Sequence, residues 1–281
     1  MIKIIADTTC CIPVERLQAL GIDFVPQIIT FGDKSYRDDF ELNTEAFLEE
    51  LQAAKNLPGT AAPPPAFYNP IYERILKDGD IALVLAPSAR LSGTFRSATV
   101  AADEFNSDQI HIIDTKTIAG NLGTIVLKAR EWAEKGMSIS ELIERVQDLA
   151  ARDQTYFLVP TMEYLHKGGR IGGAAKLIGT LLQIVPILTL RDGGIEVYDK
   201  VRSLKQAASN LVDLNASICE NNPEAYLTIG QGDSQILLDK VSSQLQDRLE
   251  LEEIPSYIAP PAIVVHAGPG LVVTSCFSRP N

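Results

Sequence analysis

The chain has 281 residues, a hydrophobic share of 46% and a formal net charge of -11 at pH 7. This length can form two domains with substantial cores, and the acidic balance argues against non-specific binding to nucleic acid or to an anionic membrane surface. The four cysteines include no Cys-x-x-Cys pair, so neither a zinc site nor a disulfide framework is indicated, and a reducing cytoplasm is the simplest compartment.

The amino-terminal half repeats one unit: a buried strand, a polar turn and then a helical segment. Apolar runs at residues 2–6, 81–86 and 109–113 predict the strands. Such alternation predicts a parallel sheet with helices on both faces, and right-handed crossovers bring the turns to one edge, where ligands bind in open sheets. The three turns are Asp7-Thr8-Thr9, Leu91-Ser92-Gly93-Thr94 and Asp114-Thr115-Lys116-Thr117.

Other elements of this half are less regular. Residues 24–29 predict a strand, which a charged loop at 33–39 and a helix at 44–54 follow. Three consecutive prolines between residues 57 and 70 predict a stiff loop, because proline excludes regular helix and central strand. A helix at 67–77 then leads into the strand at 81–86.

The organisation changes near Asp153, where we place a domain boundary. Residues 1–153 are expected to form an α/β domain and residues 154–281 an α+β domain, because Asp192-Gly193-Gly194 predicts an antiparallel hairpin. In the second half, strands are expected at 155–159, 186–190, 195–201, 225–229, 262–266 and 271–277, and helices at 174–184, 204–219 and 234–249.

Ser92 is the first candidate for a ligand-holding residue, since it stands where a buried strand gives way to a helix. Unpaired N–H groups and the positive end of the helix dipole at such a place favour an anionic oxygen. The alternative is structural: serine is a preferred N-cap, and Gly93 beside it eases a tight turn.

His266 is the histidine placed most like a site residue, at the end of an expected strand and before the tight turn Gly268-Pro269-Gly270. It can equally be a buried histidine with a structural role. A hydrolase using Ser92 and His266 is conceivable, although Ser92 lacks the Gly-x-Ser-x-Gly pattern of a nucleophile elbow. Gly168-Gly169-Arg170 does not match a P-loop, and its glycines would end a helix and let Arg170 approach a neighbour closely.

Taken together, the motifs resemble the DegV family of bacterial fatty-acid-binding proteins. No single motif is diagnostic, but their order and spacing extend over nearly the whole chain. They are Asp7-Thr8-Thr9, Thr60 in the proline loop, Leu91-Ser92-Gly93-Thr94-Phe95 with Ser97-Ala98, Asp114-Thr115-Lys116, Tyr164-Leu165 with Lys167-Gly168-Gly169-Arg170-Ile171, Asp192-Gly193 with Lys200-Val201-Arg202, and His266-Ala267-Gly268-Pro269-Gly270.

The resemblance implies a non-catalytic carrier that encloses one long-chain fatty acid, such as palmitate, in a tunnel between the two domains. The carboxylate would meet Thr60 and Ser92, with His266 in the same hydrogen-bond network and Arg170 and Gly93 close by. Arg202 would help to dock a separate fatty acid kinase, which supplies ATP and forms the acyl phosphate. We expect no cofactor, no metal and no nucleic-acid partner, and the prediction allows transient membrane contact.

Elementary energetics agree with such a ligand. A chain of some fourteen methylenes offers on the order of 11 kcal/mol of gross burial free energy at ~0.8 kcal/mol each, which exceeds association costs of several kcal/mol. The carboxylate is costly to bury unless it is hydrogen-bonded, which hydroxyls, a helix amino terminus and a histidine can provide. An acyl-transfer or hydrolytic enzyme using Ser92 and His266 stays the alternative hypothesis.

Overall fold

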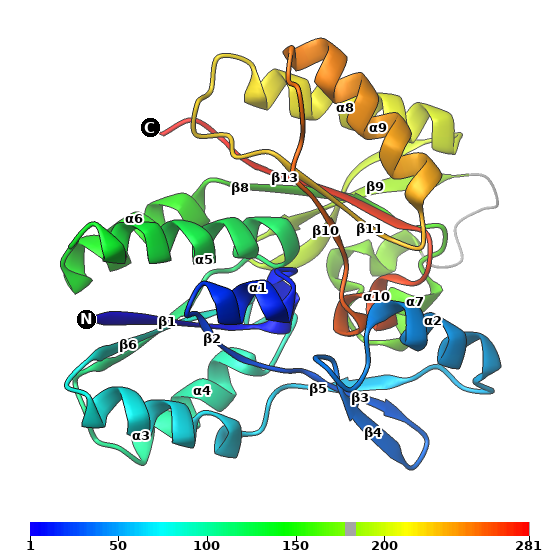
Figure 1. The fold of residues 1–281 in the computed structure, drawn as a ribbon. Helices are drawn as coiled ribbons and strands as arrows, with labels where there is room; N and C mark the ends of the chain where they lie inside the picture. Colours follow the sequence, from blue (N-terminus) through cyan, green and yellow to red (C-terminus); the bar gives the residue numbers. More distant parts are fainter. Residues whose placement is uncertain (178–183, 281) are drawn as a thin grey trace.

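The computed structural model describes residues 1–177 and 184–280. Its amino-terminal part is built on a four-stranded parallel sheet in the order β2-β1-β6-β7, as Figure 1 shows at lower left. The parallel sheet expected from the sequence is therefore confirmed. Its strands are β1 (Ile2–Asp7), β2 (Asp23–Val25), β6 (Ile81–Ala86) and β7 (Ile110–Asp114).

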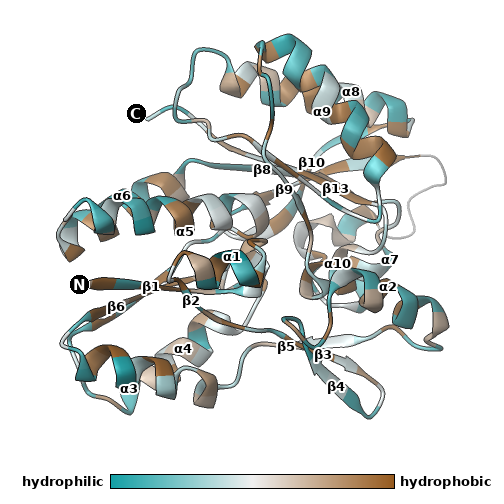
Figure 2. Cartoon of the chain, in the orientation of Figure 1, coloured by the Kyte–Doolittle hydropathy of each residue, from teal (hydrophilic) through white to brown (hydrophobic). Residues whose placement is uncertain are grey.

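Helices cover both faces of this sheet because successive strand residues face opposite sides. On β1, Ile4 and Ala6 join the core beneath one layer of helices, whereas Ile5 joins the core on the other face. Figure 2 shows apolar strands between helices whose outer surfaces are hydrophilic. The helices are α1 (Val14–Ala19), α5 (Ala119–Glu134) and α6 (Ile139–Ala151) on one face, and α3 (Asn69–Lys77) and α4 (Thr94–Asp103) on the other.

A small three-stranded sheet projects from this part, in the order β4-β3-β5. The single strand expected at 24–29 is wrong: Pro26 lacks an N–H donor and interrupts it, so β2 and β3 belong to different sheets. The charged segment expected to be a loop contains a strand, and the proline segment begins with an edge strand. These elements are β3 (Ile28–Phe31), β4 (Lys34–Arg37), α2 (Thr44–Ala53), β5 (Gly59–Ala61) and the short 3-10 helices η1 (Thr8–Cys10) and η2 (Pro65–Phe67).

The carboxy-terminal part is built on a six-stranded mixed sheet in the order β10-β9-β8-β13-β11-β12. Two helices cover one face, and alternation of side chains along β8 sends Tyr156 and Leu158 to them but Phe157 and Val159 to the opposite side. The elements are β8 (Asp153–Leu158), β9 (Val185–Arg191), β10 (Gly194–Val201), α8 (Leu204–Cys219), β11 (Thr228–Gly232), α9 (Gln235–Leu249), β12 (Ser256–Ile258) and β13 (Leu271–Phe277).

Short helices cover the other face of this sheet: α7 (Glu163–Lys167), η3 (Gly172–Leu177) and α10 (Pro261–Ala267). The strand expected at 262–266 is wrong, since these residues form α10. Its apolar residues are buried on nearly every side, and Pro261 at the first turn and Gly268 after the last mark a helix rather than a strand. Of the helix expected at 174–184, residues 178–183 lie outside the described part of the chain.

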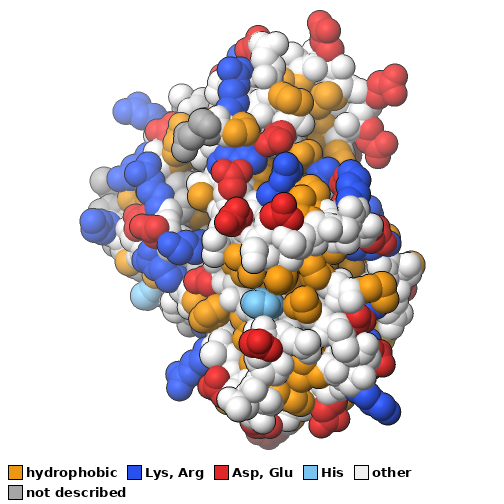
Figure 3. Space-filling view, turned by 90° about the vertical axis from the view of Figure 1, so that its left-hand side faces the viewer, with side chains coloured by type: hydrophobic (Ala, Val, Ile, Leu, Met, Phe, Trp, Pro, Cys, Tyr) orange, Lys and Arg blue, Asp and Glu red, His pale blue; other side chains and the backbone are white. Residues whose placement is uncertain are grey.

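The largest buried core joins the small sheet and α2 to the inner face of the six-stranded sheet through α10. On the face drawn in Figure 3, Lys and Arg side chains gather along one edge, and acidic side chains are spread more widely. Among the described residues, no helix combines the length and the apolar character needed to cross a membrane.

Candidate functional site

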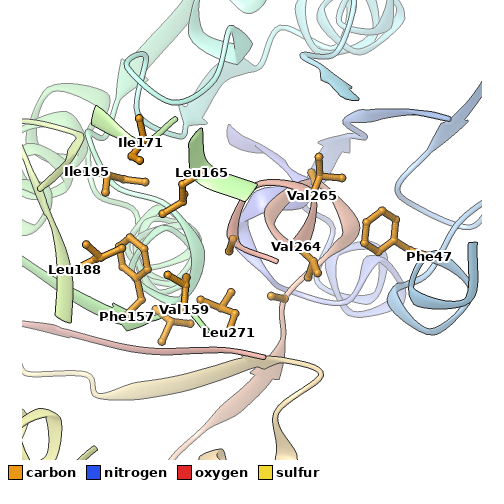
Figure 4. Packing of buried hydrophobic residues seen from close by; sticks show 14 of the residues in the cluster. Phe47, Phe157, Val159, Leu165, Ile171, Leu188, Ile195, Val264, Val265 and Leu271 are labelled. Atoms are coloured by element: carbon orange, nitrogen blue, oxygen red, sulfur yellow. The ribbon is translucent and has the colours of Figure 1, made fainter. Parts of the chain in front are cut away.

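A largely apolar cavity lies where the two parts of the chain meet. It encloses about 840 Å³ of empty space, its open mouth included. Figure 4 shows Phe157, Leu188, Ile195 and Leu165 near one another in the buried core, and of these Phe157, Leu165 and Ile195 also line the cavity. Its lining consists of Thr9, Gln27, Thr60, Ala62, Leu91, Ser92, Gly93, Ile118, Ala119, Thr155, Phe157, Leu165, Arg170, Leu190, Ile195, Ala262, Ile263, His266, Ala267, Leu271 and Val273.

The three residues predicted to bind the carboxylate, Thr60, Ser92 and His266, line this cavity, as do Arg170 and Gly93, which were expected nearby. Thr60 is presented by the edge strand β5, and its Oγ1 lies 2.7 Å from Nε2 of His266, in the last turn of α10. The fold therefore brings this pair together from the two halves of the chain, on a strand and a helix rather than on the expected loop and strand.

The imidazole of His266 is neutral at physiological pH. Burial and, to a smaller extent, the positive charge of Arg170 together lower the pKa of His266 to about 4. Its Nδ1 is buried and has no hydrogen-bond partner among the described residues. Gly168 packs against this nitrogen so closely that a Cβ atom there would lie 2.2 Å from it. The ring is thus held between Thr60 and Gly168.

Ser92 precedes α4 and belongs to a second hydrogen-bond network. Its Oγ lies 2.9 Å from Thr94 Oγ1 and accepts from the Thr94 backbone N–H at 3.3 Å. Ser92 is thus bonded locally, but the structural interpretation of Ser92 as the helix cap is wrong, because Gly93 is the N-cap of α4. Ser92 also lines the cavity. No hydrogen bond joins Ser92 to His266 in the part of the chain that the structure describes.

The network behind Ser92 ends at a buried carboxyl. Thr94 Oγ1 lies 2.9 Å from Asp7 Oδ2, and the side-chain amide of Gln27 donates to both, at 2.8 Å and 2.6 Å. Thr9 donates from its backbone and its hydroxyl to the other oxygen of Asp7. Burial raises the pKa of Asp7, against the effect of these hydrogen bonds.

Arg170 closes one side of the cavity. Its Nε donates to the carbonyl oxygen of Leu91 at 3.1 Å, and its Nη1 donates to that of Gly168 at 2.7 Å. The arginine thereby ties the loop after α7 to the segment that carries Ser92. Gly93, beside Ser92, faces the segment after β5, since a Cβ atom at Gly93 would lie 3.3 Å from Ala62 Cβ.

Arg202 lies elsewhere, between β10 and α8, with its side chain exposed. It is not among the residues that line the cavity. Sequence reasoning missed Gln27, and it did not assign a role to Thr94 or Asp7. A usable signal for Gln27 was present, because a glutamine after Pro26 within an otherwise apolar run needs a buried hydrogen-bond partner.

Two α/β parts of the chain thus meet around a largely apolar cavity, with hydroxyls and a histidine at one part of its wall. The chain belongs to the DegV family. The family model, described as "Uncharacterised protein, DegV family", matches residues 1–279.

Known relatives agree with this assignment. A DegV domain-containing protein of Deinococcus radiodurans is 32% identical over 275 residues, covering 96% of each chain. A solved DegV family structure from Thermus thermophilus, described for its fatty acid binding, matches with a TM-score of 0.92 at 28% identity over 99% of both chains. DegV from Bacillus subtilis, described as a fatty acid binding protein, matches with a TM-score of 0.87 at 27% identity over 99% of both chains.

Proposed function

We propose that this protein binds one long-chain fatty acid, such as palmitate, in the cavity between residues 1–153 and residues 154–281. The observation that supports this most directly is the lining: apolar side chains surround most of the space, and Thr60, Ser92 and His266 meet it as polar groups. The tail supplies affinity through buried methylenes, while the polar groups fix the orientation of the head.

In this proposal Thr60 donates its hydroxyl hydrogen to the carboxylate and accepts one from Nε2–H of neutral His266. Ser92 donates to the same carboxylate from the amino terminus of α4, whose dipole favours a negative charge. Arg170 adds positive charge beside the head while holding Leu91 in place. Gly93 leaves room for the carboxylate next to Ser92.

The protein then carries the acid to a separate fatty acid kinase, which forms the acyl phosphate, and serves fatty acid metabolism or lipid transport. Arg202 is proposed to contact this kinase, because it is exposed and lies outside the cavity wall. Docking there would leave the cargo undisturbed until the partner is in place.

The hydrolytic alternative has less support. A general base for Ser92 needs to reach its hydroxyl, but Nε2 of His266 is bonded to Thr60. A histidine with a pKa of about 4 is also a weak base at neutral pH. The arrangement is better suited to holding a carboxylate than to activating a nucleophile.

The test is native mass spectrometry of the purified protein, followed by solvent extraction and titration of the delipidated protein with long-chain acids. One co-purifying fatty acid per chain, or saturable binding weakened by Ser92→Ala, is expected. No bound lipid and no saturable binding of any long-chain acid would refute the proposal. Turnover of an activated acyl ester that Ser92→Ala abolishes would favour the enzyme instead.

A further inference from the structure

The two polar networks at the cavity differ in their supply of hydrogens. On one side, a ligand carboxylate, Thr60 and neutral His266 make two links, and the hydroxyl and Nε2–H supply two hydrogens. On the other side, the links run from the carboxylate to Ser92, from Ser92 to Thr94 and from Thr94 to Asp7. Each hydrogen bond uses one hydrogen, and these three links have only two hydroxyl hydrogens between them.

Within residues 1–177 and 184–280, no hydrogen bond from a neighbouring donor makes up the difference. Gln27 donates to Thr94 and to Asp7, and the backbone N–H of Thr94 donates to Ser92, but none of these hydrogens lies on the links between the oxygens. Without a further hydrogen, one link would place two oxygen lone pairs against each other in a buried site, where an unmade hydrogen bond is costly.

We infer that the fatty acid is bound together with one proton. This proton is shared along the row of hydrogen-bonded oxygens that runs from Asp7 through Thr94 and Ser92 to the ligand carboxyl. This inference rests on the proposed function. With the proton on Asp7, the hydrogens point from Asp7 through Thr94 and Ser92 to the carboxylate. With the proton on the ligand, all three point the other way. Asp7 is therefore a positioning residue that sets which way the Ser92 hydroxyl donates.

The surroundings of Asp7 agree with a shared proton. Burial raises the pKa of Asp7, so the neutral form is accessible there. The neighbouring thiols and phenol also have a raised pKa through burial and stay neutral, and Asp38, which faces Asp7 across Gln27, has a raised pKa for the same reason. These titratable neighbours are Cys10 and Cys11 in η1, Asp38 after β4 and Tyr68 before α3. His266, with a pKa of about 4, does not titrate near neutral pH.

The direct test is infrared spectroscopy of the protein with palmitate at pH 7 to 8. A protonated-carboxyl stretch is expected that either disappears in Asp7→Asn or shifts when the ligand carboxyl carries ¹³C. Asp38→Asn is the matched control, because it removes the other buried carboxyl and should leave the shared band in place. If palmitate is bound and neither Asp7 nor the ligand contributes a protonated-carboxyl band, the inference is wrong while the carrier function stands.

Affinity provides a second readout. Above the pKa of Asp7 in the empty protein, palmitate affinity should fall by up to tenfold per pH unit, because binding takes up one proton. Thr94→Val interrupts the row of hydrogen bonds between Asp7 and Ser92 and leaves Ser92 free to donate to the carboxylate. The palmitate affinity of this variant should therefore not show this pH dependence, whereas Thr94→Ser should restore it. A wild-type slope that persists unchanged in both Asp7→Asn and Thr94→Val would contradict the inference, and absence of palmitate binding in every variant would refute the carrier function itself.

Discussion

Thr60 Oγ1 and His266 Nε2 lie 2.7 Å apart although 206 positions separate the two residues in the chain. The contact joins β5 of the small sheet to α10, which packs beneath the six-stranded sheet, so it fixes the geometry of the cavity wall across both halves of the protein. The pair is partly buried, and its hydrogen bond directs the threonine hydroxyl, which is the proposed donor to the ligand.

Replacing Thr60 by valine should weaken fatty acid binding by about 10- to 100-fold, since a hydrogen bond to a charged group contributes roughly 1.5–3 kcal/mol. The side chains have nearly the same shape, so the cavity wall stays filled. Titration of the delipidated protein with palmitate measures the effect. Thr30→Val on the adjacent strand β3 removes a more exposed hydroxyl and serves as the control. Equal affinity of Thr60→Val and wild type would exclude Thr60 as a ligand.

Gly168→Ala should disturb the site from the opposite side of the imidazole. The added Cβ would lie 2.2 Å from His266 Nδ1 and 2.9 Å from the carbonyl oxygen of Tyr164, so the ring or the backbone must move. Overpacking of this kind costs about 1–3 kcal/mol, and displacement of the ring would break its bond to Thr60.

Thermal unfolding and palmitate titration should both report the Gly168→Ala change, as a lower Tm and a weaker affinity. Gly59→Ala is the matched control, since nothing lies within 4 Å of a Cβ atom at that position and its φ is not positive. If Gly168→Ala behaves like Gly59→Ala in both measurements, the imidazole is not held as described.

Acidification should cost stability through His266. The folded ring takes up a proton only near pH 4, whereas the unfolded ring does so near its ordinary pKa of 6.5. The unfolded chain therefore binds more protons between these values, and stability falls as the pH drops from about 6.5 to 4, by up to about 3 kcal/mol.

His266→Gln isolates this contribution, because glutamine does not titrate and its amide can still donate to Thr60. The raised pKa values of the buried Asp7 and Asp38 act in the opposite sense, with stability lost as the pH rises, and they are common to both proteins. Urea unfolding of wild type and variant at several pH values gives the difference. Parallel stability curves from pH 7 to pH 4 would show that His266 is not buried in its neutral form.

The regular part of the fold could be predicted from the sequence because its signals are local. The apolar runs at residues 2–6 and 81–86 are too short for helices and are followed by polar turns, so the parallel sheet follows from hydrophobic pattern alone. The helix α10 could not be predicted in this way. Its Ala-Ile-Val-Val sequence favours a strand by propensity, and burial on nearly all sides removes the amphipathic period that would identify a helix.

The candidate site was predictable in part for a related reason. The positions of polar residues at strand ends predicted site residues at Ser92 and at the turn that begins with Asp7. The pairing of Thr60 with His266 depends on tertiary packing, and only the family resemblance predicted it. Gln27 and Thr94 were not assigned roles because each hydrogen-bonds to a residue distant in sequence. Single-sequence patterns carry no information on such pairs.

Arg202→Ala should separate cargo binding from transfer. The side chain is exposed and does not line the cavity, so palmitate affinity and Tm should match those of wild type. If Arg202 contacts the kinase, the palmitate bound to the variant should be phosphorylated less efficiently. The kcat/KM for acyl phosphate formation should be lower by roughly tenfold and depend less on salt, because a charge at an interface rim acts mainly on the association rate.

The assay uses a bacterial fatty acid kinase, ATP and the palmitate-loaded protein. Lys240→Ala on α9 is the control for loss of a surface charge far along the chain from β10. Equal kcat/KM for Arg202→Ala and Lys240→Ala would place the kinase contact on another surface of the protein.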